Sequence, residues 1–260
     1  MDELQYIFVG LLGLAIGSFA NVLIYRLPRE KNVVISHSAC PKCGTMLRWY
    51  HNIPLISFAA LRGKCGFCKA PISWRYPLVE SINALLYLYF LWQFGLTLDF
   101  LVFCYLATVL LVIFFVDLDF QIIPDMLTYS GMVLGLLVAL LPGGVDIAAA
   151  CIGLLVGGGA LYLIAWLGDM LFKKESMGGG DIKLAAMLGA FLGWQKVLFI
   201  FLSSAVIGLA VSVVLMAFSA KLRQERVIPF GPFLALAAVI AMLYGDRIIA
   251  YYLHNILGLS

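Results

Sequence analysis

The sequence predicts an all-α integral membrane protein with about eight transmembrane helices and a small cytoplasmic, zinc-ribbon-like domain between the first two. Of its 260 residues, 63% are hydrophobic and only 12% are charged, and the mean hydropathy is +1.03. Ordinary soluble domains carry about 25% charged residues. The apolar runs are long enough to cross a hydrocarbon core of about 30 Å as helices of roughly 20 residues. Short alternating strands, which are typical of a β-barrel, are not found in the sequence.

The apolar runs predict the helices in order along the chain. Acidic residues rather than a positively charged leading region precede the first run, so we expect this helix to be retained and not cleaved as a signal peptide. The sixth run is short and contains glycine. The expected helices span residues 5–25, 78–94, 98–116, 127–142, 146–168, 183–195, 197–218 and 229–250.

Positive charge predicts how these helices are oriented. The polar block of residues 26–77 holds nine of the seventeen Lys and Arg residues, and the positive-inside rule places it in the cytoplasm. Alternation then brings residues 117–126, 169–182 and 219–228 to the same side. The net charge of +3 therefore reflects how the helices are oriented in the membrane. Because the basic residues lie beside the membrane, we expect lipid headgroups and not nucleic acid to be their partners.

Two Cys-x-x-Cys motifs in the polar block indicate a metal site. Cys40 and Cys43 form the first motif, and Cys65 and Cys68 form the second after 21 intervening residues. Four thiolates complete the tetrahedral shell of a structural zinc, with no position left for water. Iron in the same shell is an alternative. Two disulfides are disfavoured in a reducing cytoplasm, and a redox dithiol needs only one motif.

Three consecutive glycines precede a carboxylate at the start of the sixth apolar run. They leave the backbone free to adopt positive φ and let another chain approach closely. An ionisable side chain beside a membrane helix indicates a functional site, although a helix-capping Asp in a flexible loop is the simpler interpretation. The carboxylate is Asp181, and the supporting loop is Gly178, Gly179 and Gly180.

A second acidic segment follows the third apolar run on the same expected face. Asp117 is nearest the apolar run, Asp119 lies further along, Pro124 stops the helix, and Asp125 is placed to cap the next helix. Two adjacent carboxylates share one proton and titrate as a unit. The ionised member then takes a proton from an attacking water, while the protonated member polarises a peptide carbonyl. This pattern favours an aspartic protease with Asp117 and Asp181 as the catalytic pair.

The expected helix positions also suggest which aspartate carries the shared proton. Asp117 lies near a helix C-terminus, where the macrodipole disfavours negative charge, and Asp181 lies at a helix N-terminus, where it is favoured. We therefore expect Asp117 to be protonated in the free enzyme and Asp181 to be the base. The three histidines are scattered along the chain, so no histidine-based catalytic arrangement competes.

Several further motifs accompany these residues in a fixed order, and together they resemble the bacterial type IV prepilin peptidases, membrane aspartic proteases of the Gly-x-Gly-Asp class. The resemblance covers nearly the whole chain and implies that Asp117 and Asp181 are the catalytic pair. The motifs occupy residues 17–22, 26–28, 40–43, 65–68, 72–80, 117–128, 178–183 and 229–232.

The resemblance implies the reaction and its partners. Family members remove a basic leader peptide from prepilins and pseudopilins after a glycine, on the cytoplasmic side of the bacterial inner membrane. Many then methylate the new N-terminus with S-adenosylmethionine, and members with a cysteine-rich domain are usually bifunctional. No Rossmann-type fingerprint supports methyl transfer independently, so residues that bind this cofactor are not assigned. The alternatives are a peptidase without methyltransferase activity or, in a different class, a zinc-stabilised transporter or binding subunit.

The expected division places the first helix in residues 1–25, the metal-binding domain in residues 26–77 and the peptidase domain in residues 78–260. Small residues and one amide on the first helix are expected to serve close helix packing and hydrogen bonding. They are Gly17, Ser18 and Asn21. The sequence predicts neither the particular pilin substrates nor the oligomeric state.

Overall fold

The computed structural model describes residues 3–33, 38–173, 177–218, 229–255 and 258. Its main elements are helices, and the β pairing within the described ranges is limited to two isolated bridges. The long helices are α1 (Glu3–Arg26), α3 (Arg75–Phe94), α4 (Leu98–Phe120), α5 (Asp125–Val138), α6 (Ile147–Phe172), α7 (Gly179–Phe218) and α9 (Gly231–Asn255). Shorter helices are η1 (Leu27–Arg29), η2 (Trp49–Asn52) and α2 (Ile56–Ala60).

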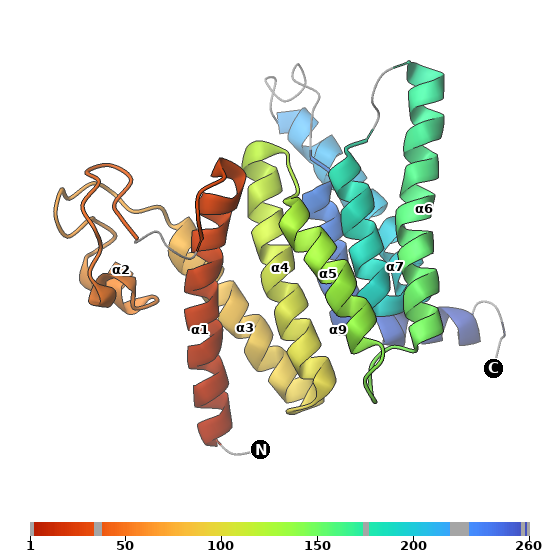
Figure 1. The fold of residues 1–260 in the computed structure, drawn as a ribbon, viewed down its shortest axis with the longest axis horizontal. Helices are drawn as coiled ribbons and strands as arrows, with labels where there is room; N and C mark the ends of the chain where they lie inside the picture. The colour runs from red at the N-terminus through yellow and green to blue at the C-terminus, as the bar shows by residue number, and fades with distance from the viewer. Residues whose placement is uncertain (1–2, 34–37, 174–176, 219–228, 256–257, 259–260) are drawn as a thin grey trace. The chain divides into compact units, whose positions relative to one another are not determined.

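Contacts divide the chain into two compact units, Met1–Val112 and Ile113–Ser260. Helix α4 runs through the division (Figure 1). The first unit holds α1, α3 and the four-cysteine segment, which we define as residues 38–74. The second unit holds both aspartates of the predicted catalytic pair.

Glycines allow α1 and α3 of the first unit to pack closely. A Cβ added to Gly17 would lie 2.8 Å from the Cα of Glu80, so only glycine fits there. Asn83 of α3 donates a hydrogen bond to the carbonyl of Gly13 at 2.8 Å, and Asn21 of α1 donates to the carbonyl of Tyr76 at 3.1 Å. Small residues and amides commonly join helices in this way in membranes. The expected packing roles of Gly17 and Asn21 are confirmed.

Glycines also bring α6 and α7 of the second unit together. A Cβ on Gly153 of α6 would lie 2.3 Å from the carbonyl oxygen of Gly189 of α7, and Figure 1 shows the two helices side by side. Gly193 breaks the helical conformation of α7 with φ 79° and ψ 168°. The break divides α7 into two helical parts, which correspond to the sixth and seventh predicted helices, and it lies close to their predicted boundary at residues 195–197.

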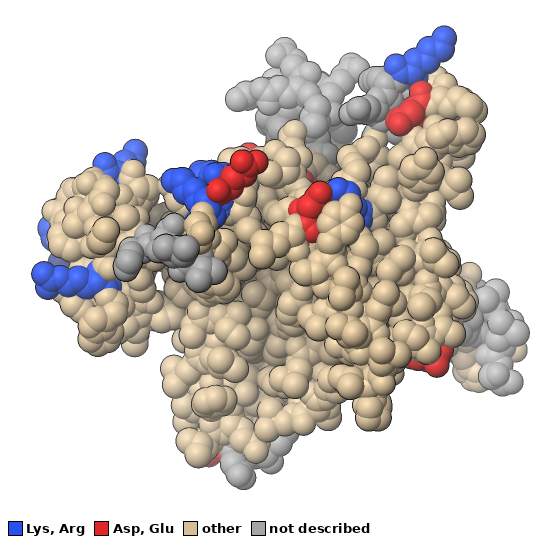
Figure 2. Space-filling model, in the orientation of Figure 1, with Lys and Arg blue, Asp and Glu red and all other residues tan. Residues whose placement is uncertain are grey.

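Five helices in the described part of the chain are long and apolar enough to cross a membrane, while α5 is shorter, with 14 residues. In both units, charged side chains on the face drawn in Figure 2 gather near helix ends and on the four-cysteine segment, and the sides of the helices carry few charges. Many large hydrophobic side chains on these helices are exposed, as expected for surfaces that face lipid. The predicted class of multi-pass, all-α membrane protein is confirmed.

Candidate active site and metal centre

The two Cys-x-x-Cys motifs fold into matching turns. In the first, the N–H of Cys40 donates to the carbonyl of Thr45 at 3.0 Å, and the N–H of Gly44 donates back to Cys40 at 2.9 Å. The second repeats this pattern, from Cys65 to Ala70 at 2.8 Å and from Lys69 to Cys65 at 3.1 Å. The fourth residue after the first cysteine has positive φ in both turns, 70° at Gly44 and 58° at Lys69. Each turn thus directs two sulfurs to one side.

The four sulfur atoms of these turns converge on one point. All four Sγ atoms lie within 4.8 Å of one another, and those of Cys40 and Cys68 are 3.9 Å apart. Tetrahedral ligands 2.3 Å from a zinc ion would be about 3.8 Å apart, so the donor set fits a metal ion.

Asp117 lies in the last turn of α4 and is 5% exposed, whereas Asp119 on the same turn is exposed. The helix ends at Phe120, and Gln121 takes a left-handed conformation with φ 55°. The next acid, Asp125, is the first residue of α5, whose N-cap is Pro124. Of the three acids in this segment, Asp117 alone is buried.

Asp181 lies in the first turn of α7, as expected, and is half-buried. Ile123 places Asp117 and Asp181 in one neighbourhood, because an added Cβ would meet it on Gly180, next to Asp181, and on Gly231, where it would also meet Asp117. The fold therefore brings together two carboxylates that are 64 residues apart in sequence. Both belong to the second unit.

The glycines before Asp181 meet one of the two expectations stated for them. None of them has positive φ, so the expected conformational freedom is not used. Gly180 does permit the expected close approach, because a Cβ there would lie 3.0 Å from the Cβ of Ile123. A Cβ on Gly178 would touch only the Asp181 carboxylate at 3.7 Å, and Gly179 has open space around it. Tight packing is confined to the residue next to Asp181.

The N-terminus of α9 forms a third side of the site. The backbone of Gly231 hydrogen-bonds the Asp117 carboxylate, and a Cβ on Gly231 would lie 2.5 Å from Oδ2 of Asp117. Ile123 touches Gly231 as well as Gly180 and is 9% exposed. This isoleucine gave no signal in the sequence, because its role depends on two distant glycines.

The α9 terminus changes the argument about the shared proton. Asp117 lies at the C-terminus of α4, but it also faces the positive N-terminal end of a second helix. Asp181 lies at the N-terminus of α7. Helix dipoles therefore no longer distinguish the two aspartates, and the assignment of the proton to Asp117 stays a prediction.

The predicted capping role of Asp125 is wrong. Pro124 occupies the N-cap of α5, and no side chain caps that helix. Asp125 instead forms an ion pair with Lys183 of α7, with Oδ1 and Nζ 2.7 Å apart. Lys183 also lies over the ring of Tyr129, 5.2 Å from its centroid. These contacts tie the start of α5 to the first turn of α7, which carries Asp181.

The comparisons with known proteins show the family of the chain. A family model described as "Bacterial Peptidase A24 N-terminal domain" matches residues 11–94, and one described as "Type IV leader peptidase family" matches residues 104–213. A protein of Stutzerimonas stutzeri named prepilin leader peptidase/N-methyltransferase is 41% identical, over 93% of this chain and 91% of its own length. The chain belongs to the type IV leader peptidase family.

Other relatives in the type IV leader peptidase family carry the same name. The Pseudomonas aeruginosa protein is 39% identical over 94% of this chain and 91% of its own length. The Legionella pneumophila protein is 38% identical over 96% of this chain and 94% of its own length. No solved structure was found to match the chain. The predicted family is thus confirmed along almost the full sequence.

Proposed function

We propose that the protein removes the leader peptide of type IV prepilins and pseudopilins after a glycine, with Asp117 and Asp181 as its catalytic pair. The observation that carries this proposal is that Asp117, which is buried, and Asp181, which is half-buried, lie at the ends of two helices that share Ile123 as a neighbour. Family membership and the names of the relatives support the reaction class.

The two carboxylates have different roles in peptide hydrolysis. One member of the pair is ionised and takes a proton from the water that attacks the scissile carbonyl, while the protonated member donates a hydrogen bond to the carbonyl oxygen. A proton then passes to the amine as it leaves. The hydrogen bond from Gly231 and the packing of Ile123 fix the two side chains before substrate binds.

Methyl transfer is the second proposed activity. The relatives are named for both activities, and this chain matches them over both the four-cysteine segment and the aspartate unit. S-adenosylmethionine would supply an electrophilic methyl group for the new N-terminal amine. The protein thus releases the leader and then modifies the terminus that cleavage creates.

We further propose that the four-cysteine centre holds zinc and that the ion is structural, because four sulfurs close the coordination shell. Cys65→Ser is expected to release the metal and unfold residues 38–74, since this segment has little other regular structure to hold it. Metal content per purified protein measures the effect. Cys151→Ser, at an exposed cysteine of α6, should keep the full metal content. Retention of one metal ion by Cys65→Ser would contradict the assignment.

The proposed location is the bacterial inner membrane, with both sites facing the cytoplasm. The support comes from the positive-inside rule applied to the basic residues of the four-cysteine segment. Residues 219–228, which are also predicted to be cytoplasmic, lie outside the described residues. Prepilins and membrane lipids are the proposed partners.

One assay tests the proposed function as a whole. Purified protein in detergent is incubated with a purified prepilin and S-adenosylmethionine carrying a labelled methyl group. We expect the leader to be released and the label to appear on the shortened pilin. Cleavage without label would show that the protein is a peptidase without methyltransferase activity. If neither reaction occurs in protein that is folded and holds its metal, the proposal is wrong and an ion-carrying role for the acids becomes the next hypothesis.

A further inference from the structure

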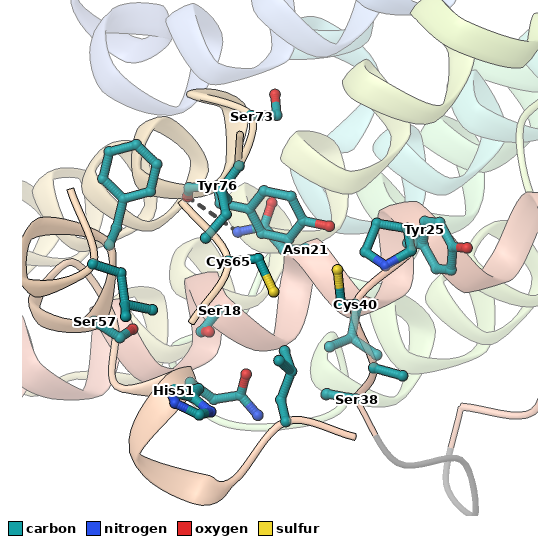
Figure 3. A pocket seen from close by; sticks show the side chains of 18 of the residues that line it. Ser18, Asn21, Tyr25, Ser38, Cys40, His51, Ser57, Cys65, Ser73 and Tyr76 are labelled. Atoms are coloured by element: carbon teal, nitrogen blue, oxygen red, sulfur yellow. Dashed lines mark hydrogen bonds between the residues drawn. The ribbon is translucent and has the colours of Figure 1, made fainter. Parts of the chain in front are cut away.

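The four-cysteine segment lies alongside α1 and does not simply follow its end. Residues of α1 between positions 15 and 26 line a cavity whose other walls come largely from the segment. In Figure 3, Ser57 of α2 lies toward Ser18 of α1, whereas Cys40 lies toward Tyr25, nearer the C-terminal end of that helix. The part of the segment that holds α2 is therefore the part that reaches furthest back along α1.

A hydrogen bond fixes how far back this part reaches. The backbone N–H of Leu55 donates to Oε2 of Glu80 at 2.9 Å, and a Cβ on Gly17 would lie 2.8 Å from the Cα of Glu80. Leu55 thus lies at the level of Gly17, nine residues before the end of α1 at Arg26, or about 13 Å at 1.5 Å per residue. The headgroup layer of a bilayer is only about 5–8 Å thick on each side. Since α1 is apolar and long enough to cross a membrane, Leu55 reaches the edge of the hydrocarbon core.

The chain at this depth is apolar and its side-chain polarity is satisfied internally. Residues 53–61 contain no charged residue. The exposed side chains of α2 are Ile56, which is 66% exposed, and two alanines. The one hydroxyl of α2, on Ser57, donates to the carbonyl of Ile53 at 2.6 Å. Polar groups that face lipid must find their partners within the protein, and this stretch meets that condition.

Two exposed tryptophans accompany α2. Trp49, the first residue of η2, is 79% exposed, and Trp74 is 77% exposed. The ring of Trp74 packs against Phe58 of α2, with the ring centroids 4.9 Å apart. Tryptophan is enriched where membrane meets water, because its ring is apolar and its N–H is polar. We call Trp49, Ile56 and Trp74 the apolar rim of the segment.

Positive charge accompanies the apolar rim. The four-cysteine segment contains five Lys or Arg residues and neither Asp nor Glu. A zinc ion with four thiolates carries a net charge of about −2, so the segment stays positive with its metal bound. Arg48 precedes Trp49 and donates a hydrogen bond to the hydroxyl of Tyr50 at 2.9 Å, and Arg62 closely follows α2. Basic residues beside tryptophan and isoleucine suit anionic lipid headgroups.

We infer that the four-cysteine segment docks on the membrane surface, with its apolar rim inserted at the boundary between headgroups and acyl chains and its basic residues on anionic headgroups. Lipid is the partner because the apolar rim lies at membrane depth along α1 and the charge of the segment is complementary to anionic lipid. The inference goes beyond the proposed reactions and does not depend on either of them. It means that the metal-binding segment is held against the bilayer and does not extend freely into water.

Collisional quenching in the full-length protein tests the depth of the apolar rim. A fluorescent amino acid replaces either Ile56 or Met46, and each protein is placed in nanodiscs of phosphatidylcholine and phosphatidylglycerol. Met46 is the matched control, because it is 65% exposed but pairs with Ala39 beside Cys40. A nitroxide on the acyl chains near the headgroups should quench the probe at position 56 at least about fivefold more than the probe at position 46. Iodide in the water should show the opposite order. Metal content and thermal unfolding show that each protein is folded.

Hydrogen exchange tests the contribution of charge. The backbone amides of residues 53–61 are followed by mass spectrometry in nanodiscs that contain phosphatidylglycerol and in nanodiscs of phosphatidylcholine alone. Anionic lipid should slow their exchange at least about tenfold. Ile56→Asp places a negative charge in the apolar rim and should abolish this difference. Met46→Asp adds the same charge outside the apolar rim and should keep it.

The outcomes decide between lipid and other partners. If iodide quenches both probes equally and the nitroxide lipid quenches neither, the segment stays in water and the inference is wrong. If neither quencher reaches position 56, a protein surface such as a second copy of the chain covers the apolar rim, which also overturns the inference. Equal quenching of both probes by the nitroxide lipid would contradict the depth order. Shielding of position 56 from iodide only after addition of a purified prepilin would assign the apolar rim to the substrate instead.

Discussion

Replacing either Asp117 or Asp181 with asparagine is expected to lower the rate of leader cleavage by about 10⁴-fold, because each substitution removes a group that handles the transferred proton. The asparagine side chain has nearly the same shape, so the fold should survive. Single-turnover cleavage of a prepilin, with enzyme in excess, measures the rate constant. The KM for prepilin should change little, since the loss concerns the reaction and not substrate binding.

Asp119 provides the matched control for this prediction. It lies two residues after Asp117 on the same helix but is exposed. Asp119→Asn should therefore cut at a rate close to that of the wild type. If Asp119→Asn were inactive and Asp117→Asn active, the assignment of the first catalytic carboxylate would be wrong.

Gly231→Ala is expected to lower kcat by about 100-fold without unfolding the protein. The added Cβ would lie 2.5 Å from Oδ2 of Asp117 and 3.1 Å from Cδ1 of Ile123, so the carboxylate or the start of α9 must move. A misplacement of about 1 Å in a catalytic group costs roughly this factor. Steady-state cleavage kinetics and thermal unfolding together distinguish a displaced carboxylate from a destabilised fold.

Gly159→Ala is the corresponding control for a glycine in a helix. Gly159 of α6 has no atom within 4 Å of an added Cβ, and alanine is the stronger helix former. This variant should keep wild-type kcat and at least wild-type stability. Wild-type kcat in Gly231→Ala would instead mean that the close contact with Asp117 does not position the carboxylate.

The sequence predicted those features that rest on local pattern. Apolar runs and charge gave the helices and their class, and the spacing of the two Cys-x-x-Cys motifs gave the cluster of four sulfurs found in the structure. Topology brought Asp117 and Asp181 to the same predicted membrane face, and in the structure residues next to both pack against Ile123. These signals need no knowledge of how distant side chains pack.

Other features depend on contacts between segments that are remote in sequence. The three glycines were expected to allow positive φ and a close approach; only the approach is found, and tertiary packing decides that Ile123 is the residue that approaches Gly180. Asp125 was expected to cap α5, but it forms an ion pair with Lys183 of α7. Glu80 accepts a hydrogen bond from the backbone N–H of Leu55, 25 residues earlier. In each case a tertiary contact overrides or replaces the local preference, and a single sequence holds no signal for it.

The central claim is that Asp117 and Asp181 act as one unit, and cleavage by the Asp117→Asn/Asp181→Asn double variant tests it most directly. Residues that act together have strongly non-additive effects. Single-turnover cleavage, followed by mass spectrometry over long incubations, compares the double variant with each single variant. We predict that all three share the same residual rate within about threefold. A further loss of 100-fold or more in the double variant would show that the aspartates act independently and would contradict the account.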